Sequence, residues 1–178
     1  MSNCPLTSGR LATCRKHSAG IKAIYLIPYG DTAYEPDITG MEVSSINNGS
    51  LTVYKFGLHS QVGSGVSTVN NDPTGSKSYE QVVTAQLHGL SDAALLSLLD
   101  EIDSGRWHVI VEDVNDKFML YGNTNGMYRT GENNTGTAGS DFNGATLTLT
   151  AIEPKGAYYV DPTWIDDVDI TIDDGSTP

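Results

Sequence analysis

The hydrophobic period of the chain changes twice between residues 78 and 122, and this stretch predicts the central elements of the fold. From Tyr79 to His88 apolar and polar side chains alternate, which is typical of a half-buried strand. An apolar stripe at helical spacing follows, formed by Leu95, Leu98, Leu99 and Ile102. The stripe predicts a short helix over about residues 92–103. A helix of three turns is marginal alone in water, so this one is expected to pack on the sheet.

A β-hairpin is predicted directly after this helix. Trp107, Val109 and Val111 alternate with His108, Ile110 and Glu112. The Asn115-Asp116 pair then favours a tight turn into the apolar run KFMLYG. The period of two places Trp107 in the core with the valines that share its face.

Other strands are predicted on both sides of this central unit. Residues 21–28 are apolar on both faces, so this strand is expected to be covered twice and to end at Pro28. Residues 30–40 are predicted as a loop and residues 41–46 as a weaker strand. In LTVYKFGLH, from Leu51, the apolar positions change phase, which indicates either a bulge or a strand covered on both faces.

Residues 60–78 are rich in Gly, Ser and Asn, and the pattern predicts a long loop. Loops of this length are uncommon in compact domains and are usually functional. Val62, Val66 and Val69 lie within it. In a protruding hairpin these valines would need a neighbouring subunit to cover them, so they are candidates for contacts between subunits.

A regular alternation near the end of the chain predicts a strand with one polar face. Leu147 and Leu149 point one way in ATLTLTAI, and the opposite face carries Thr146, Thr148 and Thr150. A row of threonines suits an exposed sheet face, because threonine has high β-propensity and a short side chain.

Length and charge bound the domain organisation. The 178 residues suffice for one domain with a sizeable core but are few for two. We therefore predict an extended basic arm at 1–20, a β-rich domain at 21–155 and an acidic tail at 156–178. The net charge of −12 argues against a nucleic-acid site built from phosphate contacts.

The charge is unevenly distributed, and the two ends are complementary. The bases Arg10, Arg15, Lys16 and Lys22 precede the first acid, Asp31. The last 18 residues hold six Asp, Asp166, Asp167 and Asp169 among them, and no base. These basic and acidic residues are candidates for a contact between adjacent subunits, although idle solvated termini explain the same pattern.

Motifs for catalysis or metal binding are absent from the sequence. It contains no HExxH, CxxC, GxGxxG or GxxxxGK[ST] motif, and its four histidines are scattered. Cys4 and Cys14 are too few for a disulfide framework or a four-cysteine zinc site. We therefore expect a non-enzymatic protein with no cofactor and no metal. The sequence has no apolar stretch long enough to span a membrane, and its N-terminus has no apolar core of a signal peptide. We therefore expect synthesis in the cytoplasm and no membrane partner.

From about residue 20 to 153 the chain resembles the tail tube (major tail) proteins of tailed bacteriophages. The resemblance rests on SYEQVVTAQLHGLS, on GRWHVIVEDVNDKFMLYG and on the closing stretch NGMYRTGENNTGTAGSDFNGATLTLTAIEP. Within the last, TGTAGSDFNGATLTLTAIEP is similar to proteins of phages that infect Bacteroidetes. The family implies an antiparallel β-sandwich or barrel with a flanking helix, six-membered rings and their stacking into a hollow tube.

The resemblance implies a virion location and partners within the tail. These are further copies of the chain, other tail proteins such as the tape measure, sheath, terminator or baseplate, and DNA that passes through the lumen without specific binding. The short polar side chains of Thr146, Thr148 and Thr150 are the candidates for lining that lumen. Tail terminators, baseplate hubs and contractile injection tubes share the fold, so fold alone does not choose among them. A monomeric carbohydrate-binding β-sandwich is the alternative from another class, with Trp107, Trp164 and tyrosines as its platform.

Overall fold

Two β-sheets and one α-helix make up the fold of the computed structural model, which describes residues 18–58, 62–73, 75–88, 93–134 and 142–175. The larger sheet has eight strands in the order β13-β4-β1-β7-β8-β12-β3-β2. The smaller sheet has five, in the order β10-β11-β6-β5 with β9 also paired to β11. The prediction of a β-rich fold with one short helix is confirmed.

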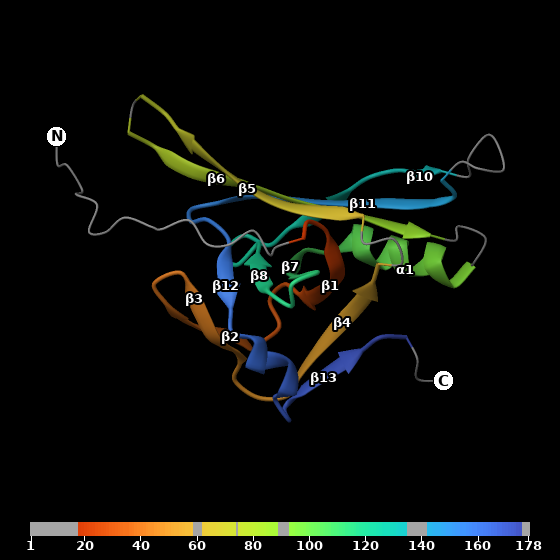
Figure 1. The fold of residues 1–178 in the computed structure, drawn as a ribbon, viewed down its shortest axis with the longest axis horizontal. Helices are drawn as coiled ribbons and strands as arrows, with labels where there is room; N and C mark the ends of the chain where they lie inside the picture. Colours follow the sequence, from red (N-terminus) through yellow and green to blue (C-terminus); the bar gives the residue numbers. More distant parts are fainter. Residues whose placement is uncertain (1–17, 59–61, 74, 89–92, 135–141, 176–178) are drawn as a thin grey trace.

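The strands of the larger sheet are β1 (Ile21–Pro28), β2 (Tyr34–Thr39), β3 (Glu42–Asn47), β4 (Leu51–Gly57), β7 (Trp107–Asp113), β8 (Phe118–Tyr121), β12 (Tyr158–Val160) and β13 (Ile170–Asp173). Those of the smaller sheet are β5 (Gly63–Asn71), β6 (Lys77–His88), β9 (Tyr128–Thr130), β10 (Asn133–Asn134) and β11 (Gly144–Glu153). The helix α1 is Ala93–Ser104, and a 3₁₀ helix, η1, spans Pro162–Asp166. In Figure 1 the smaller sheet lies across the top of the larger one.

Two hydrophobic cores lie on opposite faces of the larger sheet. The first lies between the two sheets and α1, where Leu147 and Leu149 of β11 pack with Val109 of β7 and Leu99 of α1. The second gathers buried residues of the larger sheet itself, from β1, β3, β4, β7, β8 and β12. Because strands from both ends of the sheet order contribute to the second core, the larger sheet must curve around it.

The double cover predicted for β1 is confirmed. Ile24 and Leu26 pack in the first core, whereas Tyr25 and Ile27 pack in the second. The phase change in β4 has the same cause, because Leu51 and Val53 lie in the second core while Tyr54 and Phe56 pack against the first. The strand is therefore covered on both faces.

Two segments predicted as loops are strands. Residues 30–40 contain β2, and residues 60–78 contain β5 and the first residues of β6. β5 pairs with β6 over the whole of its length, from Gly63–Ala85 to Asn71–Lys77. The Gly, Ser and Asn of β5 have low strand propensity, but the ladder bonds with β6 outweigh that local preference.

The C-terminal acidic segment is part of the domain and not a separate tail. β12 pairs in parallel with β3, and β13 pairs in parallel with β4. Trp164 of η1 is 2% exposed and packs edge-on against Tyr25 and Phe118, with ring centroids 5.1 and 5.6 Å away. Apolar residues between the aspartates account for this docking. The two parallel pairs make the larger sheet mixed and not antiparallel throughout.

Replacement of Trp164 tests whether this segment stabilises the domain. Trp164→Ala removes a fully buried aromatic side chain, so the free energy of unfolding should fall by about 3–5 kcal/mol, measured by chemical denaturation. Val168→Ala, four residues away at a position 95% exposed, is the control and should change it by less than about 0.5 kcal/mol. Equal effects of the two substitutions would contradict the docking of this segment.

Candidate functional site

The outer face of the smaller sheet carries the three predicted threonines. Thr146, Thr148 and Thr150 of β11 are half-buried and point away from the first core, in which Leu147 and Leu149 lie. Register places Thr148 between Thr84 of β6 and Thr130 of β9. Because directly opposed residues share a sheet face, these side chains form a continuous polar row.

Apolar side chains flank this row on the same face. One row across the sheet runs from β5 through β6 and β11 to β9 and consists of Val66, Val82, Thr150 and Tyr128. The exposed fractions are 48% for Val66, 52% for Tyr128 and 65% for Ile152. Among the described strand residues that point outward here, the one ionisable carboxylate is that of Glu80, and Lys and Arg are absent. The outer face is therefore broad, nearly uncharged and rich in threonine and valine.

β5 is the edge strand of the smaller sheet, and the β5–β6 hairpin projects beyond the larger sheet, at the upper left of Figure 1. The Gln86 N–H donates to the Val62 carbonyl oxygen, so the backbone groups of even-numbered residues of β5 face β6. Those of odd-numbered residues such as Ser67 face outward, where no described strand pairs with them. This is an open edge of nine residues.

The three predicted valines lie on both faces of this hairpin. Val62 and Val66 share the outer face, and Val69 lies on the opposite one, at 46% exposure. Gly65 shares the face of Val69 and rests against the larger sheet, because an added Cβ would lie 2.6 Å from the Tyr121 hydroxyl oxygen. The hairpin is thus held tightly at its base, while its valines stay exposed.

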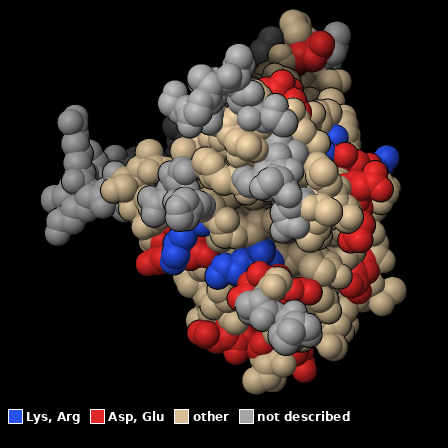
Figure 2. Space-filling view, turned by 90° about the vertical axis from the view of Figure 1, so that its right-hand side faces the viewer, with Lys and Arg blue, Asp and Glu red and all other residues tan. Residues whose placement is uncertain are grey.

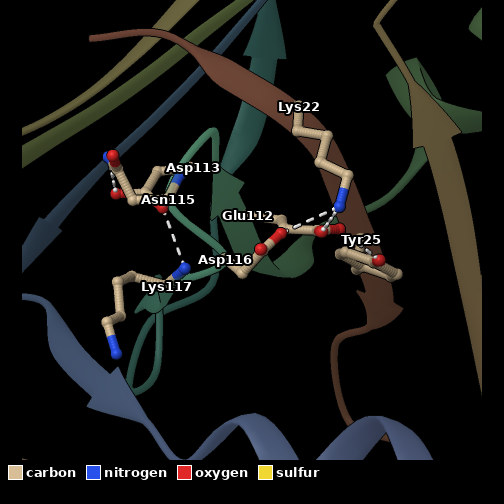
Figure 3. A network of polar contacts seen from close by, with 7 residues as sticks. All are labelled: Lys22, Tyr25, Glu112, Asp113, Asn115, Asp116 and Lys117. Carbon is tan, nitrogen blue, oxygen red and sulfur yellow. Dashed lines mark hydrogen bonds and ion pairs between the residues drawn. The ribbon is translucent and has the colours of Figure 1, made fainter. Parts of the chain in front are cut away.

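Lys22, a predicted inter-subunit residue, is paired within its own chain (Figure 3). Its Nζ lies 2.7 Å from Glu112 Oε1 and 3.0 Å from Asp116 Oδ1, and these carboxylates raise the pKa of Lys22. The Tyr25 hydroxyl donates to Glu112 Oε2 at 2.6 Å. Both oxygens of the buried Glu112 are therefore satisfied. The other predicted bases, Arg10, Arg15 and Lys16, lie outside the described residues.

The described chain begins beside the same β-turn. The Ser18 N–H donates to Asn115 Oδ1 at 3.1 Å, and Asn115 Nδ2 donates to the Ser18 carbonyl oxygen at 2.9 Å. Asp113 Oδ1 accepts the backbone N–H groups of Asn115 and Lys117, each at 2.8 Å (Figure 3). These bonds define the turn between β7 and β8 and link it to Ser18, which lies just before β1.

The predicted acidic contact residues lie at the end of η1 and in the turn that follows it. Asp167 Oδ1 accepts the Asp169 N–H at 3.0 Å, and the Asp167 N–H donates to the Trp164 carbonyl oxygen at 3.3 Å. Asp166 is the last residue of η1 and is exposed. Two of these aspartates thus shape a local turn.

Buried polar groups that the periodicity did not single out connect the two sheets. Gln81 of β6 accepts the Gly122 N–H and donates to the Lys155 carbonyl oxygen. Glu153 of β11 accepts the N–H groups of Thr124 and Asn125. A polar residue on the inward face of an alternating strand is the sequence signal for such a link.

His108 lies at the floor of a surface depression of about 480 Å³. It is 3% exposed, stacks on Tyr34 at 3.9 Å between centroids, and donates from Nδ1 to the Gly122 carbonyl oxygen at 2.7 Å. Burial lowers the pKa of His108, although the bond to Gly122 opposes this shift. The imidazole is therefore neutral at pH 7.

The two tryptophans do not form an exposed aromatic platform. Trp164 is in the second core, and Trp107 packs against the first core with its indole N–H donating to the Ile102 carbonyl oxygen at 3.0 Å. The expectation that Trp107 is a core residue agrees with this contact. A sugar site that depends on both indole rings does not fit this arrangement.

Within the described residues, no group of three or more His, Cys, Asp or Glu side chains is arranged to hold a metal ion. None of the helices there has the length and hydropathy to span a membrane. Comparisons of the chain with protein-family models, curated proteins and solved structures found no match.

The buried His108 predicts a pH dependence of stability. Its pKa is lower in the folded chain than the unfolded value of about 6.5, so the unfolded chain binds more protons below that pH. The free energy of unfolding should therefore fall as pH drops from about 7 through the lowered pKa, by about 1.4 kcal/mol for each unit of depression. Denaturation of wild-type protein at several pH values measures this slope. His108→Asn should flatten it, and equal slopes in wild type and His108→Asn would refute the assignment.

Proposed function

We propose that the protein is a tail tube subunit of a tailed bacteriophage, which assembles with copies of itself into stacked rings around a conduit for DNA. The observation that carries this proposal is the open β5 edge on a projecting hairpin with exposed valines. The two-sheet fold with one flanking helix is the architecture that the sequence resemblance implies.

An open strand edge of this length favours association. Exposed edges are templates for pairing with another chain, and proteins that remain monomeric usually blunt them with charge, proline or a covering segment. β5 contains no charged residue and no proline. Six subunits that each add a sheet edge to the next would close a ring of continuous sheet, the ring size that the family implies.

The outer face of the smaller sheet is the candidate wall of the lumen. Its Thr146, Thr148 and Thr150 row offers DNA phosphates no cationic partner, so counterions are not released and the cargo is not held. The net charge of −12 adds a general repulsion. DNA would then slide through without specific binding.

In this function the partners are further copies of the chain and neighbouring tail components, and the site of action is the virion tail after synthesis in the host cytoplasm. A tail terminator, a baseplate hub and an injection tube share the implied fold. Stacking of rings distinguishes a tube subunit from a terminator, because a terminator forms one ring that does not extend.

Blocking the β5 edge tests the assembly. Wild-type protein at high concentration should form rings or tubes by negative-stain electron microscopy. Ser67→Pro should abolish the stacked tubes, because the proline removes an outward N–H while the bonds to β6 remain. Ser67→Ala, the matched control, should assemble like wild type. Wild-type protein that remains monomeric, or Ser67→Pro protein that still forms tubes, would contradict the proposal.

A charge placed in the threonine row tests the lumen. Thr148→Lys tubes should retain short duplex DNA, and the retention should decrease steeply with salt. In a plot of the logarithm of the binding constant against the logarithm of the salt concentration, each neutralised phosphate contributes a slope of about −0.9. Wild-type tubes should retain none. Val168→Lys, at an exposed site away from this face, is the control. Equal retention by the two variants would exclude Thr148 from the lumen wall.

A further inference from the structure

Another open edge lies on β4, where its partner β13 stops early. The two strands pair in parallel from Leu51–Ile170 to Tyr54–Asp173, and β4 continues to Gly57. We call the unpaired stretch, residues 55–57, the β4 notch. The Leu58 N–H donates to the Lys22 carbonyl oxygen of the β1 side, so by alternation the backbone groups of Gly57 point away from β1. No described strand pairs with them there.

Gly57 has no local reason to be glycine. Its φ lies outside the left-handed region, and an added Cβ would meet no atom within 4 Å. Glycine inside a strand costs stability, and it often marks a place where another backbone approaches closely. Outward-facing backbone groups at a residue without a side chain allow such an approach.

An apolar groove adjoins the β4 notch. It is a cavity of about 100 Å³ lined by Leu26, Pro28, Tyr54, Phe56, Leu98, Glu101, Ile102 and Trp107. A wider depression of about 500 Å³ continues from it past Gly57 to Asp173 and Asp174. The notch thus offers backbone hydrogen bonds beside pockets for apolar side chains, the combination by which sheets bind an added strand.

The rim of the groove is mainly acidic. Glu101 of α1 lies on one side, and Asp173 and Asp174 lie on the other, with Lys55 as the base that lines it. Figure 2 shows the side of the molecule that bears α1 and β13, on which Asp and Glu cover more surface than Lys and Arg. A basic segment with a few apolar residues therefore fits this groove better than an acidic one.

We propose that the β4 notch binds residues 1–17 of a second copy of the chain as an added strand. This segment holds Arg10, Arg15 and Lys16, has no acid, and supplies Leu6 and Leu11 for the apolar groove. Its 17 residues span up to about 56 Å when extended, at about 3.3 Å each, far more than the three residues of the notch require.

The start of the described chain favours a second copy over the chain's own segment. Ser18 is bonded to Asn115 at the β7–β8 turn, and β7 lies on the opposite side of β1 from β4. The chain's own segment would have to cross two strands to reach the notch. With one donor segment and one acceptor notch per chain, the contact is head-to-tail and repeats around a ring or along a filament. The contact needs only self-association, so it does not depend on the cargo or the tail function.

Complementation between two variants tests this contact, in a Ser67→Pro background that removes pairing through β5. Gly57→Pro removes the outward N–H of the notch, and deletion of residues 1–17 removes the donor. Each double variant alone should be monomeric by light scattering, with association at least tenfold weaker than that of Ser67→Pro protein. A mixture of the two should form a 1:1 dimer, because one partner keeps the notch and the other keeps the segment.

The control is Thr52→Val in the same background, since Thr52 lies on β4 where β13 already covers the edge. It should associate like Ser67→Pro protein. The mixed dimer should weaken in 1 M salt, where the Debye length is about 3 Å. A mixture that remains monomeric overturns the proposal, and this is the result expected if each notch is occupied by the chain's own segment. Undiminished association of either double variant also overturns it. Tube formation is not the readout, so failure here leaves the β5 contact separately testable.

Discussion

The double burial of β1 is the constraint on which the rest of the fold depends. Its side chains are apolar on both faces, and β7 beside it is buried on both faces as well. A strand of this kind is stable only when water is excluded from both sides. The smaller sheet and α1 cover one side. The larger sheet covers the other by curving around its own second core, and η1 brings Trp164 to close that core.

Burying so much of the sheet also encloses polar groups, and each needs a partner. Unpaired buried donors or acceptors cost about 1–3 kcal/mol, so their pairing restricts how the sheets can pack. Gln81 joins β6 to the loops after β8 and β11, and Glu112 is shared by Tyr25 and Lys22. On the helix side, both oxygens of Asp103 lie 2.7 Å from Arg129 Nη1, which ties α1 to β9. These links favour one arrangement of the layers over other packings of the same apolar strands.

The residues of the two hydrophobic cores are buried, but the sheets keep strand edges without a hydrogen-bonded partner among the described strands. β5 leaves an edge on the smaller sheet, and the early end of β13 leaves the β4 notch on the larger one. The first edge lies on a hairpin with exposed valines, whereas the second lies between acidic groups and an apolar groove. Two edges of such different chemistry allow two different contacts with neighbouring copies. This favours an assembly that extends in more than one direction over a closed dimer.

The sequence alone determined the elements whose pattern is local. The alternation in β6, β7 and β11, the helical stripe of α1 and the outward row of Thr146, Thr148 and Thr150 all follow from side-chain period, which depends on neighbouring residues. Tertiary structure decided which weakly patterned segments become strands. β2 and β5 are rich in Gly, Ser, Asn, Asp or Pro, and each is a strand because it pairs with the next strand along the chain. β13 has only four residues, ITID, and its ladder bonds come from the distant β4. The pairing of Lys22 with Glu112 and the open edge at Gly57 likewise depend on which strand lies beside which. Period is a property of a short stretch, whereas a hydrogen-bonding partner far along the chain is selected only when the whole core is formed.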